Sequence, residues 1–435
     1  MLSAGPGAAV AAPAGHAREG APTPALRIVY LWDADYPWDV RTEKVCAALT
    51  ARGHDVHIIA RNTARRPVVE RRPEGTVHRM RPWRWLPERA DALLGFPLFL
   101  SPRWLSLLTT VVRENRPHVI IARDLPLCPA AILVGRRTGV PIILDMAENY
   151  PAVISAIWEA GRQRPLDVLV RNPSIVAAVE RYCIRRVDRI LVVAEEARTR
   201  LEGMGVPRDR IDVVLNTPPR ARAQQAATGS RSAPGAPLVV VYLGLLEIVR
   251  GIGDLIAAAA ILRDRGRPVR IRLAGNGRDM ALFQAQAASL GLTERDVEFL
   301  GFLPNDRALE IVAAADIGAN PLHDGEKHDT CVPNKLFDYM AASLPVLTSD
   351  TIPSARIVRE TKCGEVFRAR DAHSLADALV RLADPEVRAA EGRAGRIAVL
   401  ERYHWERDCE VLSGAVARVT SDTGHSRTRG NILSR

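Results

Sequence analysis

The stretch that decides the fold is residues 237–277, which reads PLVVVYLGLLEIVRGIGDLIAAAAILRDRGRPVRIRLAGNG. It opens with an apolar run over 237–243 that is rich in β-branched residues and has the length of a buried strand. A helical pattern over 252–265 follows, and a second β-branched run occupies 269–274. Because a helix joins the two runs, the strands are expected to lie parallel in a sheet that helices cover.

The same alternation of short apolar runs and helical stretches extends over most of the chain. Before the quoted stretch, the predicted strands and helices are 26–31, 42–52, 56–60, 119–122, 129–138, 141–145 and 189–193. After it, they are 279–290, 296–300, 308–315, 317–321, 334–342 and 345–347. The predicted fold class is therefore α/β, with two doubly wound, Rossmann-like domains that face a cleft.

A break in composition separates the two series. Residues 217–236 are rich in Pro, Ala, Arg and Gln, which is typical of a linker. The predicted division is a disordered tail over 1–25, a first domain over 26–216, the linker, a second domain over 237–400 and a loose tail over 421–435.

Composition and charge exclude several classes of protein. The 435 residues, 47% of them hydrophobic, suffice for two to three cores and exclude a wholly disordered chain. No apolar run reaches the roughly 18 residues of a membrane-spanning helix. The net charge of +10 fits nucleic acid, an anionic membrane or anionic small molecules. No helix-turn-helix or aromatic-basic module supports nucleic acid, so that partner is not expected.

Cysteine and histidine positions bear on redox state and metals. The six cysteines stand alone, without a Cys-x-x-Cys pair, which indicates reduced thiols and a cytoplasmic protein. His323, His328 and Cys331 lie close in sequence, but their spacing matches no zinc pattern, so no metal site is predicted.

One basic segment could contact lipid. Residues 61–90 carry nine Arg and three Glu, with Trp83 and Trp85 among them, and an apolar run over 92–100 follows. Arg and Trp beside an apolar stretch suit the headgroup layer of an anionic membrane. They also suit an ordinary loop and core helix, which is the reading the sequence favours, so membrane contact of residues 61–100 at the inner face of the cytoplasmic membrane is a hypothesis.

Two loops after strands of the second domain have features of a phosphate site. Gly244 ends the strand 237–243 and lets a ligand approach the backbone, and Arg250 stands where the next helix begins. The following strand ends in Gly275-Asn276-Gly277. This differs from the dinucleotide fingerprint because Met280 replaces the third glycine, so a dehydrogenase is rejected.

The sharpest local signal is residues 332–342, VPNKLFDYMAA. Asn334 is a plausible cap, and a helix that begins there offers free N–H groups and a partial positive charge. Lys335 in the first turn disfavours the helix dipole, which suggests a bound anion nearby. Asp338 lies one turn further on the same side, where a carboxylate can accept hydrogen bonds from a ribose diol.

In the first domain, carboxylates follow neighbouring strands. Asp124 follows the strand 119–122, while Asp145 and Glu148 end and follow the strand 141–145. Such loops could face the cleft and contact a hydroxylic acceptor or a reacting sugar, or they could serve only as caps.

These pieces together resemble the GT-B glycosyltransferases of family 4, retaining nucleotide-sugar enzymes of bacterial envelope polysaccharide synthesis. The resemblance covers nearly all of residues 26–412. It rests on segments in a fixed order, namely 37–41, 51–56, 123–127, 145–151, 214–216, 242–251, 274–277, 301–304, 333–339 and 403–405. The last of these implies that residues 401–420 form a helix that crosses back onto the first domain.

The resemblance implies a role for each matched position. Arg250 and Lys335 would hold the diphosphate of a nucleotide sugar, with a UDP-sugar favoured and no cofactor or metal required. Leu336 would help through its backbone N–H, and Asp338 would bind the ribose. The remaining candidates are Gly244, Asn276, Gly277, Leu303 and Asn334 for the donor, Asp145 and Glu148 for catalysis, and Arg41 and Asp124 for a saccharide or lipid-linked acceptor.

Three positions depart from the family's pattern. Thr330 replaces the first carboxylate of its Glu-x7-Glu motif, Ala147 replaces a common histidine, and Leu245 replaces the usual Arg after the donor-loop glycine. These departures keep open an alternative reading, a catalytically silent nucleotide-binding or scaffold protein of the same fold.

Overall fold

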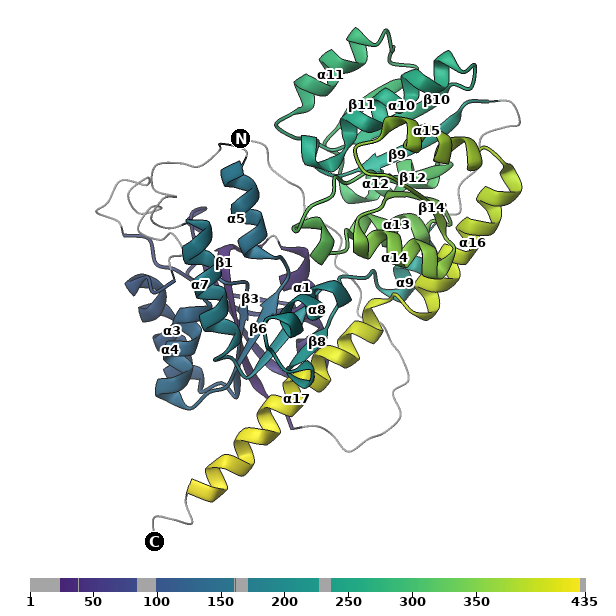
Figure 1. Cartoon of the computed structure of the whole chain (residues 1–435). Coiled ribbons are helices and arrows are strands. Elements are labelled where there is room, and N and C mark those ends of the chain that lie inside the picture. Colours follow the sequence, from purple (N-terminus) through teal and green to yellow (C-terminus); the bar gives the residue numbers. More distant parts are fainter. Residues whose placement is uncertain are drawn as a thin grey trace.

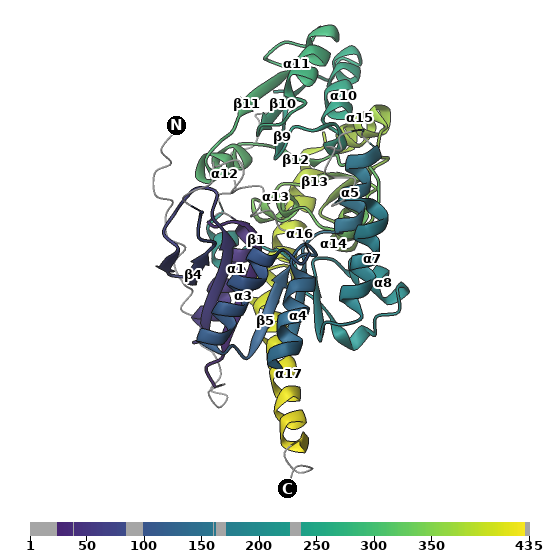
Figure 2. The same ribbon diagram turned by 90° about the vertical axis from the view of Figure 1, so that its left-hand side faces the viewer.

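A computed structural model describes residues 24–37, 39–83, 99–159, 161, 171–226 and 236–430. Over these residues the chain forms two sheets, each lying between layers of helices, which confirms the predicted α/β class (Figure 1). A view from the side shows the second domain above the first (Figure 2). The predicted N-terminal tail up to residue 23, Trp85, the run 92–98 and residues 227–235 of the linker lie outside the described residues.

The first sheet has eight strands in the order β3-β4-β2-β1-β5-β6-β7-β8. In chain order they are β1 (Arg27–Asp35), β2 (Asp55–Arg61), β3 (Val69–Arg72), β4 (Gly75–Arg79), β5 (Val119–Arg123), β6 (Ile142–Met146), β7 (Arg189–Val192) and β8 (Ile211–Val213). Only β3 and β4 pair antiparallel, as a hairpin at one edge. The hairpin lies in the basic segment 61–90, where the sequence analysis predicts no strand.

Successive side chains of a strand point to opposite faces of the sheet, and both sets are apolar in β1. Helices cover both faces and bury these side chains. They are α1 (Val40–Ala51), α3 (Pro102–Asn115), α4 (Cys128–Thr138), α5 (Tyr150–Glu159), α7 (Pro173–Ile184) and α8 (Glu195–Gly203). Val29 and Leu31 of β1 pack in one core with α3, α4 and α7. Ile28 and Tyr30 pack in the other core with α1 and with α17 (Trp405–Gly430).

The second sheet has six parallel strands in the order β11-β10-β9-β12-β13-β14. They are β9 (Leu238–Leu243), β10 (Val269–Ala274), β11 (Val297–Gly301), β12 (Ile317–Asn320), β13 (Val346–Ser349) and β14 (Gly364–Phe367). The accompanying helices are α10 (Ile252–Asp264), α11 (Met280–Ser289), α12 (Asn305–Ala313), α13 (Asn334–Ala341), α14 (Ile352–Thr361), α15 (Ala372–Arg381) and α16 (Pro385–Glu401). Order reverses between β9 and β12, and ligands of such sheets bind at that switch point.

Two connections join the domains. The predicted linker contains a short helix, α9 (Arg220–Gln225), which the sequence analysis did not predict. After α16 the chain turns, and α17 runs back along the first domain (Figure 1), where Leu412 and Val416 enter the core. This helix continues to Gly430, so the segment from residue 421 is helical where a loose tail was expected. The backbone N–H of Trp405 donates to Pro218 O at 2.9 Å, which ties the two connections together.

Candidate functional site

The loops after β9 and β10 fit against each other through their backbones. A Cβ at Gly275 would lie 1.8 Å from Gly244 O, and one at Gly277 would lie 2.0 Å from Leu246 O. The N–H of Leu246 donates to Asn276 O at 3.1 Å. Gly277 and Asn276, which are predicted to contact the donor, therefore act here through the packing of one loop on the next.

Gly244 makes room for a cation. Its φ is +135°, a conformation open to glycine, and a Cβ there would lie 3.2 Å from Lys335 Nζ. Lys335 Nζ lies 3.6 Å from the centroid of the Tyr242 ring, which is a cation–π contact. The first turn of α13 thus places an ammonium group against the loop that follows β9.

A second cation stands beside this one. Burial, followed by the charge of Arg250, lowers the pKa of Lys335 well below its usual range. In the described part of the chain Lys335 Nζ has no hydrogen bond or ion pair, and Arg250 Nε is buried without a partner. Two adjacent cations with no carboxylate between them are unfavourable by themselves, and an anion bound between them removes that cost.

The start of α13 differs from the expectation in detail. Pro333, not Asn334, occupies the N-cap, and Asn334 is the exposed first residue of the helix. The N–H of Leu336 donates to Pro333 O at 3.1 Å in this conformation, so its donation to a ligand stays a prediction. By helix geometry, the amides of Asn334 and Lys335 are the ones without a partner inside the helix.

Asp338 faces the interdomain connection. Its nearest charged partner is Arg222 of α9, with Nη2 and Oδ1 3.6 Å apart. Burial raises the pKa of Asp338, and the charges of Arg222 and Lys44 oppose that rise. The structure therefore places Asp338 toward the linker helix and α1, and its contact with a ribose stays a prediction.

The loop after β11 borders the same edge of the sheet. The N–H of Gly275 donates to Gly301 O at 2.8 Å, which joins this loop to the one after β10. Phe302 is 76% exposed and Leu303 is half-buried. An exposed aromatic ring beside two glycine-rich loops offers a flat apolar surface to a ligand.

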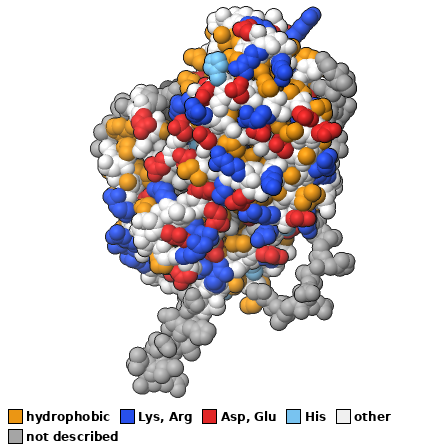
Figure 3. Space-filling view, turned by 45° about the vertical axis from the view of Figure 1, so that its right-hand side comes forward, with side chains coloured by type: hydrophobic (Ala, Val, Ile, Leu, Met, Phe, Trp, Pro, Cys, Tyr) orange, Lys and Arg blue, Asp and Glu red, His pale blue; other side chains and the backbone are white. Residues whose placement is uncertain are grey.

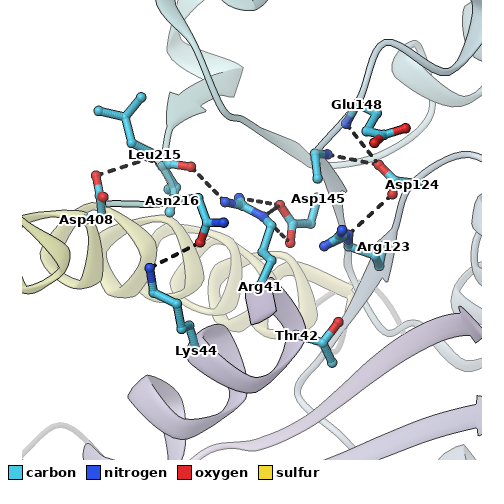
Figure 4. A network of polar contacts seen from close by, with 12 residues as sticks. Arg41, Thr42, Lys44, Arg123, Asp124, Asp145, Glu148, Leu215, Asn216 and Asp408 are labelled. Atoms are coloured by element: carbon cyan, nitrogen blue, oxygen red, sulfur yellow. Dashed lines mark hydrogen bonds and ion pairs between the residues drawn. The ribbon is translucent and has the colours of Figure 1, made fainter. Parts of the chain in front are cut away.

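Asp145 and Arg41 form a buried pair, not a surface for ligands (Figure 4). Arg41 Nη2 donates to Asp145 Oδ1 at 2.6 Å, and Tyr30 Oη donates to Oδ2 at 2.8 Å. Arg41 Nη1 also donates to Val214 O at 2.9 Å. Burial would raise the pKa of Asp145, but the charge and hydrogen bonds of Arg41 lower it overall. In this conformation the two side chains form a buried pair that joins β6, α1 and the residue after β8, in contrast to the expectation that they face a ligand. The catalytic role of Asp145 and the acceptor role of Arg41 stay predictions.

Asp124 positions Glu148. Asp124 has a left-handed φ of +59°, and its Oδ1 accepts hydrogen bonds from the N–H groups of Ala147 at 2.9 Å and Glu148 at 3.4 Å. Figure 4 shows the Asp124 carboxylate between the Arg123 guanidinium and the backbone N–H of Glu148. Burial raises the pKa of Asp124 to about 7. Asp124 is therefore a positioning residue, in contrast to its predicted contact with an acceptor.

Glu148 lies where the domains meet. It is exposed and lines a small pocket with Thr330 of the second domain. Its charge raises the pKa of Cys331, after the larger effect of burial, while that of Arg250 lowers it, so both side chains lie near Cys331. The structure thus brings Glu148 toward the Arg250 side of the cleft.

Contacts across the cleft come from residues that the sequence analysis missed. Glu326 Oε1 lies 3.3 Å from Asn149 Nδ2 and 3.5 Å from Arg200 Nε. Arg356 Nε donates to Glu196 Oε1 at 2.6 Å. No motif marks these side chains, because their pairing depends on how the domains meet.

The three departures have simple structural explanations. Thr330 is buried, and its hydroxyl donates to Glu326 O at 2.9 Å. Leu245 is 54% exposed, and Ala147 contributes its N–H to Asp124. Lys335 brings a cation to the Gly244 loop, which Leu245 cannot do.

The described residues offer neither a metal cluster nor a membrane-spanning helix. Those residues contain no group of three His, Cys, Asp or Glu side chains that could hold a metal ion. They contain no helix that is long and apolar enough to span a membrane. On the face shown in Figure 3, basic and acidic side chains are interspersed.

Comparisons with known proteins agree with this architecture. Residues 39–217 match a model described as a glycosyl transferase 4-like domain, and residues 237–384 match one described as glycosyl transferases group 1. D-inositol 3-phosphate glycosyltransferase of Nocardia farcinica is 30% identical over 329 residues, which cover 67% of this chain and 71% of that protein. 2-Deoxystreptamine glucosyltransferase of Streptomyces kanamyceticus is 31% identical over 269 residues, which cover 58% and 66%.

Solved structures share the fold. Sucrose-phosphate synthase of Thermosynechococcus elongatus superposes with a TM-score of 0.70 at 18% identity, covering 91% of this chain and all of that one. Anabaena HepE in complex with UDP-glucose gives a TM-score of 0.66 at 14% identity, covering 90% and 100%. Fold and site thus define a two-domain transferase with the GT-B fold. The chain belongs to the glycosyltransferases that pair a 4-like domain with a group 1 domain.

Proposed function

We propose that this glycosyltransferase moves a hexosyl group from a nucleoside diphosphate sugar, with a UDP-sugar favoured, to a saccharide or lipid-linked acceptor. The observation that carries the proposal is the pair of cations, Lys335 and Arg250, which lack a carboxylate partner in the described part of the chain. A diphosphate supplies the two negative charges that this arrangement lacks.

The same cations suit the chemistry of transfer. As the bond between the sugar and the diphosphate breaks, negative charge grows on the departing phosphate oxygen. Arg250, Lys335 and the free amides at the start of α13 stabilise that charge from fixed positions. Because side chains provide this stabilisation, the proposed reaction requires no metal ion.

Resemblance and relatives support the finer parts of the proposal. Retention of the anomeric configuration and a role in envelope or exopolysaccharide synthesis rest on the family resemblance. HepE has been solved with UDP-glucose, which supports a UDP-sugar as donor. The proposal assigns contact with the reacting sugar to Glu148, and two observations support it: its N–H donates to Asp124, and its side chain lines a pocket with Thr330 of the second domain.

Calorimetric titration with UDP tests the phosphate assignment. Lys335→Ala and Arg250→Ala should each weaken binding about 10- to 150-fold, the effect of losing a charge-assisted hydrogen bond. Lys362→Ala, at the exposed end of α14, and Arg265→Ala, at the far end of α10, are matched controls and should bind like wild type. Unchanged UDP affinity in both Lys335→Ala and Arg250→Ala would reject the proposal.

Transfer itself is tested with radiolabelled UDP-sugars, with and without EDTA. Transfer or slow donor hydrolysis that persists in EDTA supports a metal-independent enzyme. Binding of UDP with neither reaction, across a panel of hexoses, would favour the catalytically silent alternative.

Membrane contact is a separate part of the proposal. Arg103 stacks over the Trp83 ring at 4.5 Å, so one Trp of the basic segment is already in contact with the protein. Flotation with anionic liposomes of phosphatidylglycerol should enrich the protein at low salt. Absence of enrichment would reject contact with the inner face of the cytoplasmic membrane.

A further inference from the structure

The short helix η3 (His328–Thr330) forms the wall of the second domain that meets the first. Thr330 of η3 lines a pocket with Glu148, and Glu326, just before η3, contacts Asn149 and Arg200. We call Arg250 and Lys335, the residues proposed to hold the diphosphate, the phosphate cradle. A sugar that moves from donor to acceptor must lie between this cradle and the first domain. Side chains of η3 that border Arg250 are therefore next to that position.

His328 is such a side chain. It is 5% exposed, and its Nε2 is buried without a hydrogen-bond partner. The segment before it is held to the end of the donor loop, because the N–H of His323 donates to Val249 O at 3.1 Å. His328 also lies near the guanidinium of Arg250, whose Nε is likewise buried without a partner.

The protonation state of His328 follows from its contacts. Its Nδ1 lies 2.8 Å from His323 O, and because a carbonyl oxygen only accepts, Nδ1 must carry the proton. Burial, with the nearby charge of Arg250, lowers the pKa of His328 to about 4, although the bond to His323 O opposes this. The ring is therefore neutral near pH 7, and Nε2 presents a lone pair.

The lone pair on Nε2 can accept a hydrogen bond but cannot donate one. A diphosphate has no proton to donate near neutral pH, so Nε2 cannot bind the phosphate that Arg250 holds. A hydroxyl group can donate to it. Of the hydroxyl-bearing parts of a nucleotide sugar, the hexose lies on the acceptor side of the diphosphate, where η3 meets the first domain, while the ribose lies on the other side.

We propose that His328 Nε2 accepts a hydrogen bond from one hydroxyl of the transferred hexose and so takes part in choosing the donor sugar. This inference rests on the proposed function. It assigns the neighbouring cations to the diphosphate and His328 to the sugar, which divides one buried cluster into two kinds of recognition.

Two substitutions test the roles of the two ring nitrogens of His328 separately. His328→Asn keeps a donor where Nδ1 meets His323 O and removes the acceptor at Nε2. His328→Gln places an amide oxygen near the position of Nε2. Melting temperatures establish that both variants fold, and UDP affinity establishes that the cradle is intact.

The probes are UDP, UDP-glucose, UDP-galactose and the monodeoxy analogues of whichever hexose binds wild type more tightly. We expect His328→Asn to bind UDP like wild type and to bind that UDP-hexose about tenfold more weakly, the effect of one lost hydrogen bond. One deoxy analogue should bind wild type about tenfold more weakly than the parent UDP-hexose does. His328→Asn should bind that analogue and the parent UDP-hexose with the same affinity. His328→Gln should recover part of the loss.

Three results would overturn the inference. They are equal loss of UDP and UDP-hexose affinity in His328→Asn, wild-type affinity for the hexose in that variant, and deoxy analogues that weaken both proteins alike. Failure of wild type to bind UDP at all would instead defeat the proposed function, so the two failures are distinguishable.

Discussion

Replacing Lys335 with Met should weaken ligand binding and stabilise the free protein at the same time. The ammonium of Lys335 is held beside Arg250 with no anionic partner among the described residues. Burial, followed by the charge of Arg250, lowers the pKa of Lys335. Met keeps much of the side-chain length and contact with the Tyr242 ring while it removes the charge.

The magnitudes follow from the two states. In the free protein, a fully buried polar group without a partner costs about 1–3 kcal/mol. Lys335 is half-buried, so Met should recover about 1 kcal/mol, the lower end of that range. For a domain of about 150–250 residues that unfolds as a unit, each kcal/mol corresponds to about 2–4 °C in Tm. In the complex, Lys335→Met lacks the charge-assisted contact between the Lys335 ammonium and the diphosphate, which is worth about 1.5–3 kcal/mol. The Kd for UDP should therefore rise about 10- to 150-fold.

The pH dependence has a definite sign. Because the folded state binds the Lys335 proton less tightly than the unfolded state, the free energy of unfolding should rise with pH up to the ordinary pKa of a lysine side chain, about 10.4. Lys335→Met should remove this component. Saturating UDP should remove it too, because the diphosphate raises the pKa of Lys335 again, and binding should take up protons.

The assay combines calorimetry in buffers of different ionisation enthalpy with denaturant unfolding across pH. Lys362→Met, at the exposed end of α14, is the matched control and should change neither quantity. A Lys335→Met protein that is less stable than wild type, or that binds UDP equally well, would refute the reasoning.

Three further predictions concern the first domain and the cleft. Asp124→Ala should lower kcat about tenfold and leave UDP affinity unchanged, since Asp124 orients the turn at Glu148, whereas Asp124→Asn should keep activity. Because burial raises the pKa of Asp124 to about 7, wild-type stability should fall between pH 4 and 7, and the Asn variant, followed by urea unfolding, should lack that component. Arg41→Met should cost about 3–5 kcal/mol in denaturant unfolding by leaving Asp145 charged and unpaired, and Arg41→Met with Asp145→Leu should regain part of the loss; equal stability of the two proteins would contradict this. Glu326→Lys should open the cleft by repelling Arg200, seen as a larger radius of gyration in X-ray scattering, and an unchanged radius would show that this contact does not hold the domains together.

Much of the fold was predictable because it depends on local pattern. The β-branched runs at 237–243 and 269–274 are strands β9 and β10, and the helical pattern between them is α10. The hairpin over residues 69–79 escaped prediction because VERR and GTVHR lack an apolar run, and their pairing depends on neighbouring β2.

The candidate site was predictable where function depends on position along a strand or helix. Arg250 and Lys335 follow from the end of β9 and the start of α13, and the structure brings them together. The pairing of Asp145 with Arg41 could not be predicted, because a carboxylate after a strand looks the same in sequence whether it faces a ligand or a buried guanidinium.

The sequence by itself determined the parallel α/β domains, the glycine loops and the two cations, because strand period, helix period and glycine conformation are local properties. Only the tertiary structure decided that Asp145 is buried, that Asp124 orients Glu148 and that the Nε2 lone pair of His328 is buried near Arg250 without a partner. Those outcomes depend on which groups meet and exclude water, from 24 residues apart for Asp124 and Glu148 to 104 for Arg41 and Asp145. The energy of a charge or lone pair is set by such partners, not by its neighbours along the chain.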